Sequence, residues 1–333
     1  MDLKEFYRGK KVFVTGAGGF IGSHVVEELV MKGAEVTALV HYNASSYINN
    51  LRFVPQEILS KVDIKFGDVT DAFQMQTLTK DSDIVLHLAA LIGIPYSYAA
   101  PAAYVAANIN GTLNMLEAAR NNSISKIVVT STSETYGTAI YTPIDEKHPM
   151  QGQSPYSATK IGADKLAESY FLSFNLPVCV FRPFNTFGPR QSMRAVIPTI
   201  ITQALNSKEI KLGSLSPVRD MVFVKDTARG FLMAGMEDKS IGEVISVGTG
   251  VGATVGEIAE MILNILGSDK KIVEDSQRVR PEKSEVFKLI CDNRKAKELL
   301  NWSPQYTLEE GLREAISFIQ KNINSYEADK YTV

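Results

Sequence analysis

The stretch KVFVTGAGGFIG, residues Lys11–Gly22, decides the fold of this chain. Its first half is rich in β-branched and aromatic residues and predicts a short strand over Lys11–Thr15. Its second half opens a segment in which apolar side chains recur on one helical face, so a helix is predicted over Phe20–Met31. A glycine-rich turn, GAGG, joins the two predicted elements.

The glycines of this turn have the spacing of a dinucleotide-binding motif. Gly16 permits a tight turn, Gly19 lets the backbone approach a pyrophosphate, and Gly22 permits close contact between helix and strand. The first N–H groups of the helix, at Phe20 and Ile21, lie at the positive end of the helix dipole, which favours phosphate. A glycine-rich turn alone is only a connection, but its place between a strand and a helix predicts dinucleotide binding.

Strands and helices continue to alternate through the first half of the chain. Near-continuous apolar strands that alternate with helices predict an α/β fold, a Rossmann-type doubly wound parallel sheet with helices on both faces. We expect a dinucleotide-binding domain over residues 1–182, with a returning segment at about 220–250. A smaller C-terminal domain, mainly substrate-binding and built from insertions, is expected over residues 183–333. The further strands are predicted over Glu35–Val40, Asp63–Phe66, Ile84–Leu88, Lys126–Thr130, Pro177–Arg182 and Ile241–Val247, and the further helices over Pro101–Ala119, Tyr156–Phe174, Val255–Leu266 and Leu308–Gln320.

The charge balance excludes several classes of function. The 333 residues include 35 Lys and Arg against 37 Asp and Glu, so the whole chain offers no electrostatic basis for binding nucleic acid or a membrane surface. The two cysteines form no disulfide framework, and the charged N-terminus lacks the apolar core of a signal peptide, so a reduced, cytoplasmic protein is expected. His24 and His148 show no metal-ligand spacing, and no metal site is predicted.

One segment, residues 84–116, contains no Asp, Glu, Lys or Arg and is long enough to span a bilayer. It also contains a histidine, two prolines and three asparagines, and it lies in the middle of the chain. We therefore expect it to be buried within a globular fold. Its predicted parts are the strand Ile84–Leu88, a loop over Ala89–Tyr98 that faces cofactor and substrate, and a helix that begins at Pro101.

The end of the second predicted strand bears on the choice of cofactor. An acidic residue there would bind the 2′-hydroxyl of NAD and repel a 2′-phosphate. None is present, and His41 with its polar neighbours can accommodate a phosphate, so NADP is mildly favoured over NAD. Asp68 and Val69, after the third strand, are placed to meet the adenine, although a simple turn is the alternative interpretation.

A candidate acid–base pair follows in the predicted helix Tyr156–Phe174. Tyr156 and Lys160 lie four residues apart and therefore on one helical face. A tyrosine hydroxyl, with a pKa of about 10, is a poor base at neutral pH. A nearby ammonium, aided by the positive charge of an oxidised nicotinamide, stabilises the phenolate. Behind a dinucleotide motif, this pair is predicted to serve hydride transfer.

The chain resembles the extended short-chain dehydrogenase/reductases over nearly its whole length. The resemblance rests on the glycine motif, on His87-Leu88-Ala89-Ala90, on Asn108, on Thr130–Gly137, and on Tyr156 with Lys160. It implies a tightly bound, recycled NAD or NADP, with Lys160 holding the nicotinamide ribose and Asn108 supporting the active site from beneath. The residues implied beside the cofactor are Leu88, Ala89, Ala90 and Thr130. It also implies a homodimer formed through the two long helices.

The segment Thr130–Gly137, TSTSETYG, bears on the reaction. Nucleotide-sugar 4-epimerases usually lack a carboxylate before the Tyr-Gly, whereas this segment, with Glu134, is similar to that of nucleotide-sugar 4,6-dehydratases. The nearest resemblance is to the nucleotide-diphospho-N-acetylglucosamine 4,6-dehydratases of the legionaminic-acid route, and it is carried by the segments Leu91–Tyr98, Gln151–Tyr156 and Arg182–Ser192 (RPFNTFGPRQS). It implies that Tyr156 takes the proton of the 4-hydroxyl, Thr132 binds that oxygen and Glu134 removes the carbon 5 proton. Ser133 or Glu134 would assist the loss of water. A nucleotide-sugar 4-epimerase and a non-catalytic cofactor-binding regulator are the alternatives.

A nucleotide-diphosphate sugar is the implied substrate. Arg219 and Arg280 are the candidates for binding the diphosphate, because planar guanidinium groups bind phosphate through two hydrogen bonds. The resemblance places Asn185 at the sugar phosphate and Glu282 at the ribose. The remaining candidates are Ser97 in the loop that faces the sugar, and Val196, Lys211 and Leu212 around the nucleobase. The choice between uracil and guanine stays open.

Overall fold

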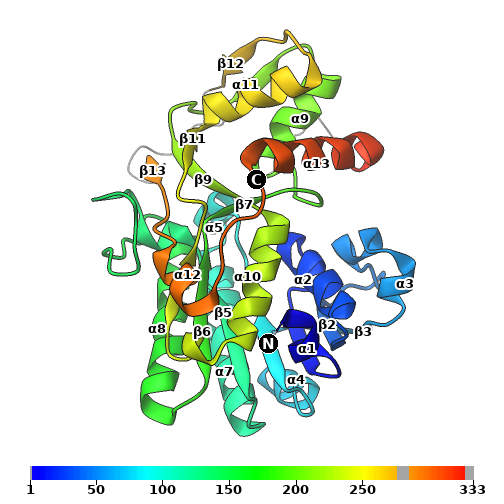
Figure 1. Cartoon of the computed structure of the whole chain (residues 1–333), viewed down its shortest axis with the longest axis vertical. Coiled ribbons are helices and arrows are strands. Elements are labelled where there is room, and N and C mark those ends of the chain that lie inside the picture. Colours follow the sequence, from blue (N-terminus) through cyan, green and yellow to red (C-terminus); the bar gives the residue numbers. More distant parts are fainter. Residues whose placement is uncertain (1, 276–284, 327–333) are drawn as a thin grey trace.

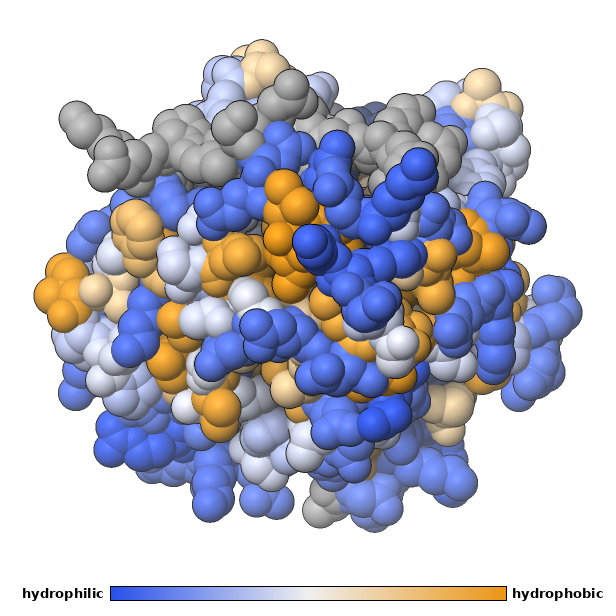
Figure 2. All heavy atoms as spheres, turned by 90° about the horizontal axis from the view of Figure 1, so that it is seen from above, coloured by the Kyte–Doolittle hydropathy of each residue, from blue (hydrophilic) through white to orange (hydrophobic). Residues whose placement is uncertain are grey.

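A computed structural model describes residues 2–275 and 285–326 of the chain. Figure 1 shows a larger unit, in which a sheet is covered by helices, and above it a smaller unit that contains α9, α11 and α13. Seen from above, apolar side chains are interspersed with hydrophilic ones on the face that the smaller unit presents (Figure 2). In the described part of the chain, no helix has the length and apolar character needed to cross a membrane.

Seven parallel strands form the sheet of the larger unit, in the order β10-β6-β5-β4-β1-β2-β3. In chain order they are β1 (Lys11–Thr15), β2 (Glu35–His41), β3 (Asp63–Gly67), β4 (Ile84–His87), β5 (Lys126–Thr130), β6 (Val178–Pro183) and β10 (Val244–Val247). Every residue of β4 and β6 is buried, as expected for parallel strands covered on both faces. Because β1 lies between β2 and β4, the winding reverses there, and the turns after β1 and β4 open onto one crevice. The predicted doubly wound fold is confirmed.

Helices cover both faces of this sheet because successive residues of a strand point to opposite faces. Val12 and Val14 of β1 share one core with Leu29, and Phe13 shares another core with Leu116. The helices and helical turns of the larger unit are α1 (Leu3–Tyr7), α2 (Phe20–Met31), η1 (Asn49–Phe53), α3 (Gln56–Leu59), α4 (Ala72–Leu78), α5 (Ile94–Ala99), α6 (Pro101–Tyr104), η2 (Val105–Asn110), α7 (Gly111–Asn121), η3 (Ser133–Tyr136), α8 (Pro155–Phe174), α10 (Val224–Met236), η4 (Asp238–Ser240) and α12 (Arg294–Leu300).

The uncharged segment differs from its prediction in two places. The predicted loop Ala89–Tyr98 contains the short helix α5, so that part of the prediction is wrong. Pro95 stands in the first turn of α5, where the missing N–H of proline is not needed. The long helix predicted from Pro101 is present, but its middle part, η2, is π-helical. Such segments are frequent at functional sites, and η2 contains Asn108.

The smaller unit contains two short sheets and three amphipathic helices. Strand β9 (Val218–Phe223) pairs with β7 (Asn185–Phe187), β11 (Gly252–Thr254) and β13 (Lys288–Leu289), and β8 (Ile210–Leu212) pairs with β12 (Ile272–Glu274). The helices are α9 (Val196–Asn206), α11 (Val255–Leu266) and α13 (Leu308–Lys321), and the helical turn η7 (Ile323–Ser325) follows. They share a core of apolar side chains that includes Ile200, Ile262 and Ile316. The chain returns from here to the larger unit through α10, β10 and α12.

Candidate active site

A cavity of about 1320 Å³ lies at the carboxyl ends of the central strands and extends to residues of the smaller unit. Pockets for one small ligand usually measure about 300–1000 Å³, so this cavity has room for a dinucleotide and a second ligand. Most of the predicted site residues line it: Gly16, Gly19, Phe20, Ile21, Gly22, His41, Asp68, Val69, Leu88, Ala89, Ala90, Thr130, Thr132, Ser133, Glu134, Tyr156, Lys160, Asn185, Val196, Leu212 and Arg219.

The glycine turn has the geometry that a dinucleotide needs. Gly16 has a φ of +66°, and a Cβ added there would lie 2.7 Å from the backbone nitrogen of Ala89. A Cβ at Gly22 would lie 2.2 Å from the carbonyl oxygen of Gly16. Gly19 is the N-cap of α2 and has no side chain that could occupy the space before the first free N–H groups. The turn therefore fits a bound pyrophosphate at the N-terminus of α2.

The adenosine end of the cavity brings together two residues that follow neighbouring strands. Nε2 of His41, at the end of β2, lies 3.4 Å from the carboxylate of Asp68, after β3. Partial burial raises the pKa of Asp68, but hydrogen bonds from Thr70 and the proximity of His41 outweigh it and lower the pKa. A carboxylate is thus present beside the residue that is predicted to meet a 2′-phosphate.

The predicted catalytic residues of the TSTSETYG segment lie in a single helical turn, η3, after β5. Thr132 is its N-cap, and its hydroxyl accepts a hydrogen bond from the backbone N–H of Glu134 at 3.2 Å. Gly137, with a φ of +63°, ends the turn. Thr132 and Glu134 are half-buried, and Ser133 is buried. One turn therefore presents two hydroxyls and one carboxylate to the cavity.

Helix α8 begins with a capping box between Ser154 and Ser157, which fixes the position of Tyr156 in its first turn. Burial raises the pKa of Tyr156, a hydrogen bond with Thr132 lowers it, and the charge of Glu134 raises it. Tyr156 therefore lies next to the catalytic turn.

Lys160 lies one turn after Tyr156, and its ammonium donates a hydrogen bond to the carbonyl oxygen of Thr130 at 2.5 Å. Burial lowers the pKa of Lys160, and the charge of Asp164 opposes this effect. The expectation that Lys160 supports a phenolate and holds the nicotinamide ribose stays a prediction.

Asn108 does not line the cavity but lies beneath it. Its side chain accepts a hydrogen bond from the backbone N–H of Leu91 at 2.8 Å and donates to the Leu91 carbonyl oxygen at 3.0 Å. It also donates to the hydroxyl of Thr159 at 3.0 Å. Asn108 thus joins the loop after β4 to helix α8, and its supporting role in the active site stays a prediction.

On the substrate side, Arg219 lies in β9 with its side chain largely buried. Its guanidinium donates to the carbonyl oxygen of Val218 at 3.1 Å and to a carboxylate oxygen of Glu285 at 3.3 Å. Asn185 and Gln191 also line the cavity. In the described part of the chain, Asn185 Oδ1 and Gln191 Oε1 are buried acceptors without a hydrogen-bond partner. Such atoms are well suited to accept hydrogen bonds from a ligand.

The structure places two predicted substrate residues outside the cavity. Ser97 is fully buried in α5, and its hydroxyl donates to the carbonyl oxygen of Ile94 at 2.6 Å. Lys211 points to solvent because alternate residues of β8 face opposite sides, and its ammonium pairs with Glu209 at 3.5 Å. Arg280 and Glu282 lie outside the described residues.

Sequence reasoning missed several residues of the cavity wall. These are Tyr47, Asn49, Asn50, Thr186, Gln191, Met193, Arg194, Met221, Val255 and Glu285. Gln191 lies in the motif RPFNTFGPRQS that supported the resemblance, and this motif was the available signal. Glu285 carries no local signal, because it reaches the cavity only through the packing of β13 against β9. Within residues 2–275 and 285–326, no group of three His, Cys, Asp or Glu residues is arranged to hold a metal.

A doubly wound sheet, a dinucleotide turn and a Tyr–Lys pair beside a second binding region define a short-chain dehydrogenase/reductase of the epimerase/dehydratase type. The family model for GDP-mannose 4,6-dehydratase matches residues 13–315, and the chain belongs to that family. Its members use a nicotinamide dinucleotide to modify nucleotide sugars.

Known relatives include both epimerases and dehydratases. A putative UDP-glucose 4-epimerase of Methanocaldococcus jannaschii is 31% identical over 93% of this chain and 99% of its own. A double mutant of DesIV of Streptomyces venezuelae, a dTDP-glucose 4,6-dehydratase solved with NAD, has a TM-score of 0.86 at 27% identity, covering 96% of this chain and 99% of its own. The UDP-N-acetylglucosamine 4-epimerase of Methanobrevibacter ruminantium, solved with UDP-N-acetylmuramic acid, has a TM-score of 0.85 at 31% identity, covering 95% and 99%.

Proposed function

We propose that the protein is a nucleotide-sugar 4,6-dehydratase that converts UDP- or GDP-N-acetylglucosamine into the 4-keto-6-deoxy sugar nucleotide. The observation that carries this proposal is the position of Glu134. Its half-buried carboxylate lies in the same turn as Thr132 and close enough to Tyr156 to raise the pKa of the phenol. A carboxylate at this point supplies a second base, which an epimerase does not need and an elimination across carbons 5 and 6 does.

The residues of the cavity divide the chemistry between them. The oxygen of Tyr156 removes the proton of the 4-hydroxyl, while the hydroxyl of Thr132 binds the same sugar oxygen. A bound nicotinamide would accept the hydride from carbon 4 and, after the loss of water, return it to carbon 6. The ketone at carbon 4 acidifies the proton on carbon 5, which the carboxylate of Glu134 removes. The buried hydroxyl of Ser133, or Glu134 itself, then protonates the oxygen that leaves carbon 6.

A hexosamine nucleotide fits the polar groups of the second binding region. The guanidinium of Arg219 supplies a cation for the diphosphate, although the carboxylate of Glu285 lies beside it. The unpartnered oxygens of Asn185 and Gln191 accept hydrogen bonds from sugar hydroxyls or from the N-acetyl amide. These contacts and the resemblance to the dehydratases of the legionaminic-acid route support N-acetylglucosamine as the sugar.

Two observations bear on the cofactor in opposite directions. The absence of an acidic residue directly after β2 favours NADP, and His41 is available to a 2′-phosphate. The carboxylate of Asp68, 3.4 Å from His41, favours NAD because it repels that phosphate. We propose NADP by a small margin, and titration of the protein with NAD and NADP at one ionic strength decides between them.

We also propose a homodimer in which the long helix from α6 to α7 and helix α8 of one copy pack against those of the other. These helices form the outer layer of one sheet face, and Val105, Leu172 and Phe174 are exposed on them. Sedimentation equilibrium tests the stoichiometry. A Leu172→Glu variant is expected to weaken the dimer, and a monomeric wild-type protein contradicts the proposal.

The first experiment separates the dehydratase from a 4-epimerase, which the epimerase relatives support equally. Purified protein is incubated with UDP- and GDP-N-acetylglucosamine, and the products are analysed by mass spectrometry. Loss of water supports the dehydratase, whereas an epimerised product of unchanged mass overturns it in favour of the epimerase.

The second experiment tests the base. Glu134→Gln is expected to abolish both loss of water and exchange of solvent deuterium at carbon 5. Glu168→Gln, which changes a half-buried carboxylate of α8 that pairs with Lys165, is the matched control and should react like wild type. A Glu134→Gln variant that dehydrates normally contradicts the assignment.

A further inference from the structure

A buried ion pair lies directly behind the catalytic turn. Arg182, near the end of β6, and Asp164, in α8, are both fully buried, and their nearest charged atoms are 2.6 Å apart. Removing two charges from water is costly, and a buried pair often stabilises a fold no more than apolar residues of the same size. The position of this pair therefore calls for an explanation beyond stability.

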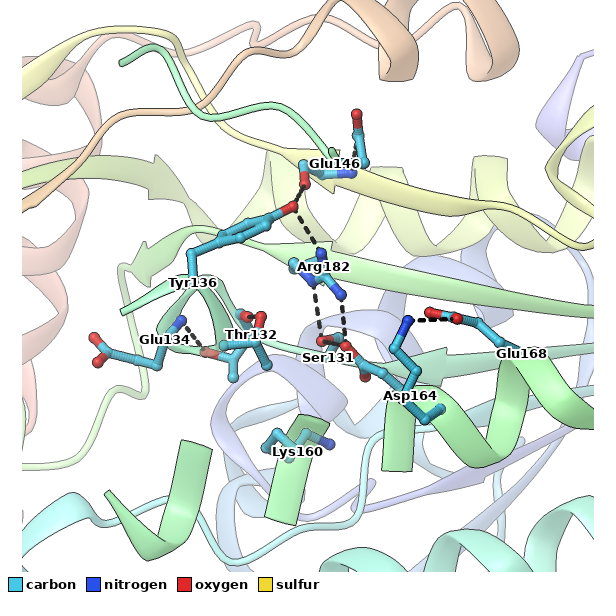
Figure 3. Close-up of polar contacts among 12 residues, drawn as sticks. Ser131, Thr132, Glu134, Tyr136, Glu146, Lys160, Asp164, Glu168 and Arg182 are labelled. Carbon is cyan, nitrogen blue, oxygen red and sulfur yellow. Dashed lines mark hydrogen bonds and ion pairs between the residues drawn. The ribbon is translucent and has the colours of Figure 1, made fainter. Parts of the chain in front are cut away.

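The guanidinium of Arg182 reaches both ends of the catalytic segment (Figure 3). At the start of the segment, Nε donates to the hydroxyl of Ser131 at 3.2 Å. At its end, Nη1 donates to the hydroxyl of Tyr136 at 2.7 Å, and the guanidinium carbon lies 4.7 Å from the centre of the Tyr136 ring. Thr132 and Glu134 lie between these two anchored residues, and the Glu134 side chain points away from Arg182 in Figure 3.

Asp164 completes this arrangement from the side of the helix. The hydroxyl of Ser131 donates to the same carboxylate oxygen that pairs with Arg182, at 2.6 Å. Asp164 also lies four residues after Lys160, on the same face of α8. One carboxylate thus contacts the start of the catalytic turn and lies beside the ammonium that neighbours Tyr156.

On the side of Tyr136, the hydrogen bonds around Arg182 continue to strand β10, where the chain has returned to the larger unit. The hydroxyl of Tyr136 lies 2.9 Å from that of Ser246 in β10, and the backbone N–H of Ser246 donates to Glu146 at 2.7 Å. Strands β5, β6 and β10 and helix α8 therefore all contribute to holding a turn of a few residues. A stretch of backbone held at both ends by buried hydrogen bonds loses little further entropy when substrate binds.

We propose that Arg182 and Asp164 are positioning residues, which hold Ser131 and Tyr136 so that Thr132 and Glu134 keep their places relative to Tyr156. Neither touches the reacting atoms. This proposal rests on the proposed function in one respect only: the dehydratase reaction defines which step depends most on Glu134. A displacement of about 1 Å in a catalytic group can lower a rate by about 100-fold, so loosening the turn should slow the reaction strongly.

The test removes the anchoring hydroxyls rather than the ion pair, because an unpaired buried charge can unfold the protein. The variants are Ser131→Ala and Tyr136→Phe. Their matched controls delete buried hydroxyls far from the site: Ser240→Ala, whose hydroxyl donates to the carbonyl oxygen of Ala234, and Tyr7→Phe, whose hydroxyl donates to that of Leu232 at 2.7 Å. The unfolding midpoints, kcat and KM of all four are compared with those of wild type.

Each anchor variant is expected to lower kcat by about 10- to 100-fold, with KM within about twofold of wild type. Reduced cofactor should accumulate during turnover. Oxidation at carbon 4 does not use Glu134 and continues, whereas the elimination that needs a correctly placed Glu134 is slowed. The controls should keep wild-type kcat at a similar loss of thermal stability. If the anchor variants lose no more kcat than their controls, the positioning role is overturned.

The two proposals fail in different ways. Wild-type protein that epimerises without losing water overturns the dehydratase assignment. The positioning role is then measured as kcat for epimerisation, which depends on Thr132 and Tyr156. Loss of that kcat in the anchor variants supports the role, and wild-type values overturn it.

Discussion

Nδ1 of His87 lies 2.8 Å from the hydroxyl of Thr15, at the point where the two central strands β1 and β4 end. That hydroxyl already accepts hydrogen bonds from the backbone N–H groups of Leu88 and Ala89, so its own proton goes to His87. His87 therefore carries its proton on Nε2, which faces the hydroxyl of Thr112 at 3.2 Å. One neutral, buried imidazole thus joins Thr15, at the end of β1, to Thr112 in α7, while the hydroxyl of Thr15 also holds the loop after β4.

Two buried histidines should make the stability of the protein depend on pH. Burial lowers the pKa of His24 and of His87 to about 3, whereas each titrates near 6.5 in the unfolded chain. Below pH 6.5 the unfolded state binds more protons than the folded state, so the stability gained at higher pH is lost as the pH falls toward 3. Between pH 7 and pH 5 the free energy of unfolding should fall by about 2 kcal/mol for each histidine.

Urea unfolding at pH 7, 6 and 5 measures this dependence. The single variants His24→Asn and His87→Asn should each flatten the slope, because each removes one group that gains a proton on unfolding. Slopes that are the same in both variants and in wild type would rule out the protonation mechanism.

The tight contact at Gly22 predicts a selective loss of cofactor. In Gly22→Ala the added Cβ would lie 2.2 Å from the carbonyl oxygen of Gly16, so the turn must open where the pyrophosphate binds. We expect the affinity for NAD and NADP to fall by at least about 100-fold, or 2.7 kcal/mol. Gly256→Ala is the control, because a Cβ there has no neighbour nearer than 3.7 Å. Calorimetric titration with both dinucleotides provides the measurement, and wild-type affinity in Gly22→Ala would contradict the assignment of the turn.

Tyr156 should be needed for turnover and not for folding. Tyr156→Phe keeps the ring that packs edge-to-face against Tyr104, at 6.2 Å between ring centres, and removes only the hydroxyl. General acid–base groups contribute about 100- to 10,000-fold, so kcat should fall within that range while cofactor binding and the unfolding midpoint stay near wild type. Deuterium exchange at carbon 5 should also stop, since it follows oxidation at carbon 4. A variant that retains more than a tenth of wild-type kcat would exclude Tyr156 as the base.

The parts of the fold that follow from the sequence are those set by local pattern. Strand β1 and helices α2 and α11 were predicted with the residue bounds that the structure has, because their apolar residues repeat at the period of the element. Helix α10 was missed because it begins at Val224, directly after β9 ends at Phe223, with no turn residue between them. Strands β7, β8 and β12 have three residues each, too few to show a period, and their partners determine them.

The residues of the site likewise fall into those that a local sequence pattern predicts and those that only tertiary packing brings to the cavity. The glycine turn and the Tyr156–Lys160 spacing are contained in single segments and could be predicted from the sequence. Glu285 reaches the cavity through tertiary packing and left no local pattern. Arg182 is the last residue of the predicted strand Pro177–Arg182, and no local pattern indicates that it is buried. In the structure it is fully buried against Asp164 and links helix α8 to the catalytic turn after β5.

The buried carboxylate of Asp164 should set the pH range of activity. Its charge raises the pKa of Lys160, against burial, and also adds to the burial that raises the pKa of Tyr156. Asp164→Asn removes this charge, so the pKa values of both groups fall. If turnover needs Tyr156 deprotonated and Lys160 protonated, the rise and the fall of kcat/KM with pH both move to lower pH.

The matched control for this profile is Glu168→Gln, which changes a half-buried carboxylate one turn after Asp164 that pairs with Lys165 instead of Arg182. If Asp164 had a purely structural role, Asp164→Asn would lower the amount of active enzyme but would move neither limb of the kcat/KM profile. The pKa values in the molecules that remain folded would then be those of wild type. Profiles recorded from pH 5 to 10 at constant ionic strength separate the two cases. A shift of both limbs in Asp164→Asn alone would show that the ion pair behind the turn acts on the acid–base residues, and unchanged limbs would restrict it to holding the turn in place.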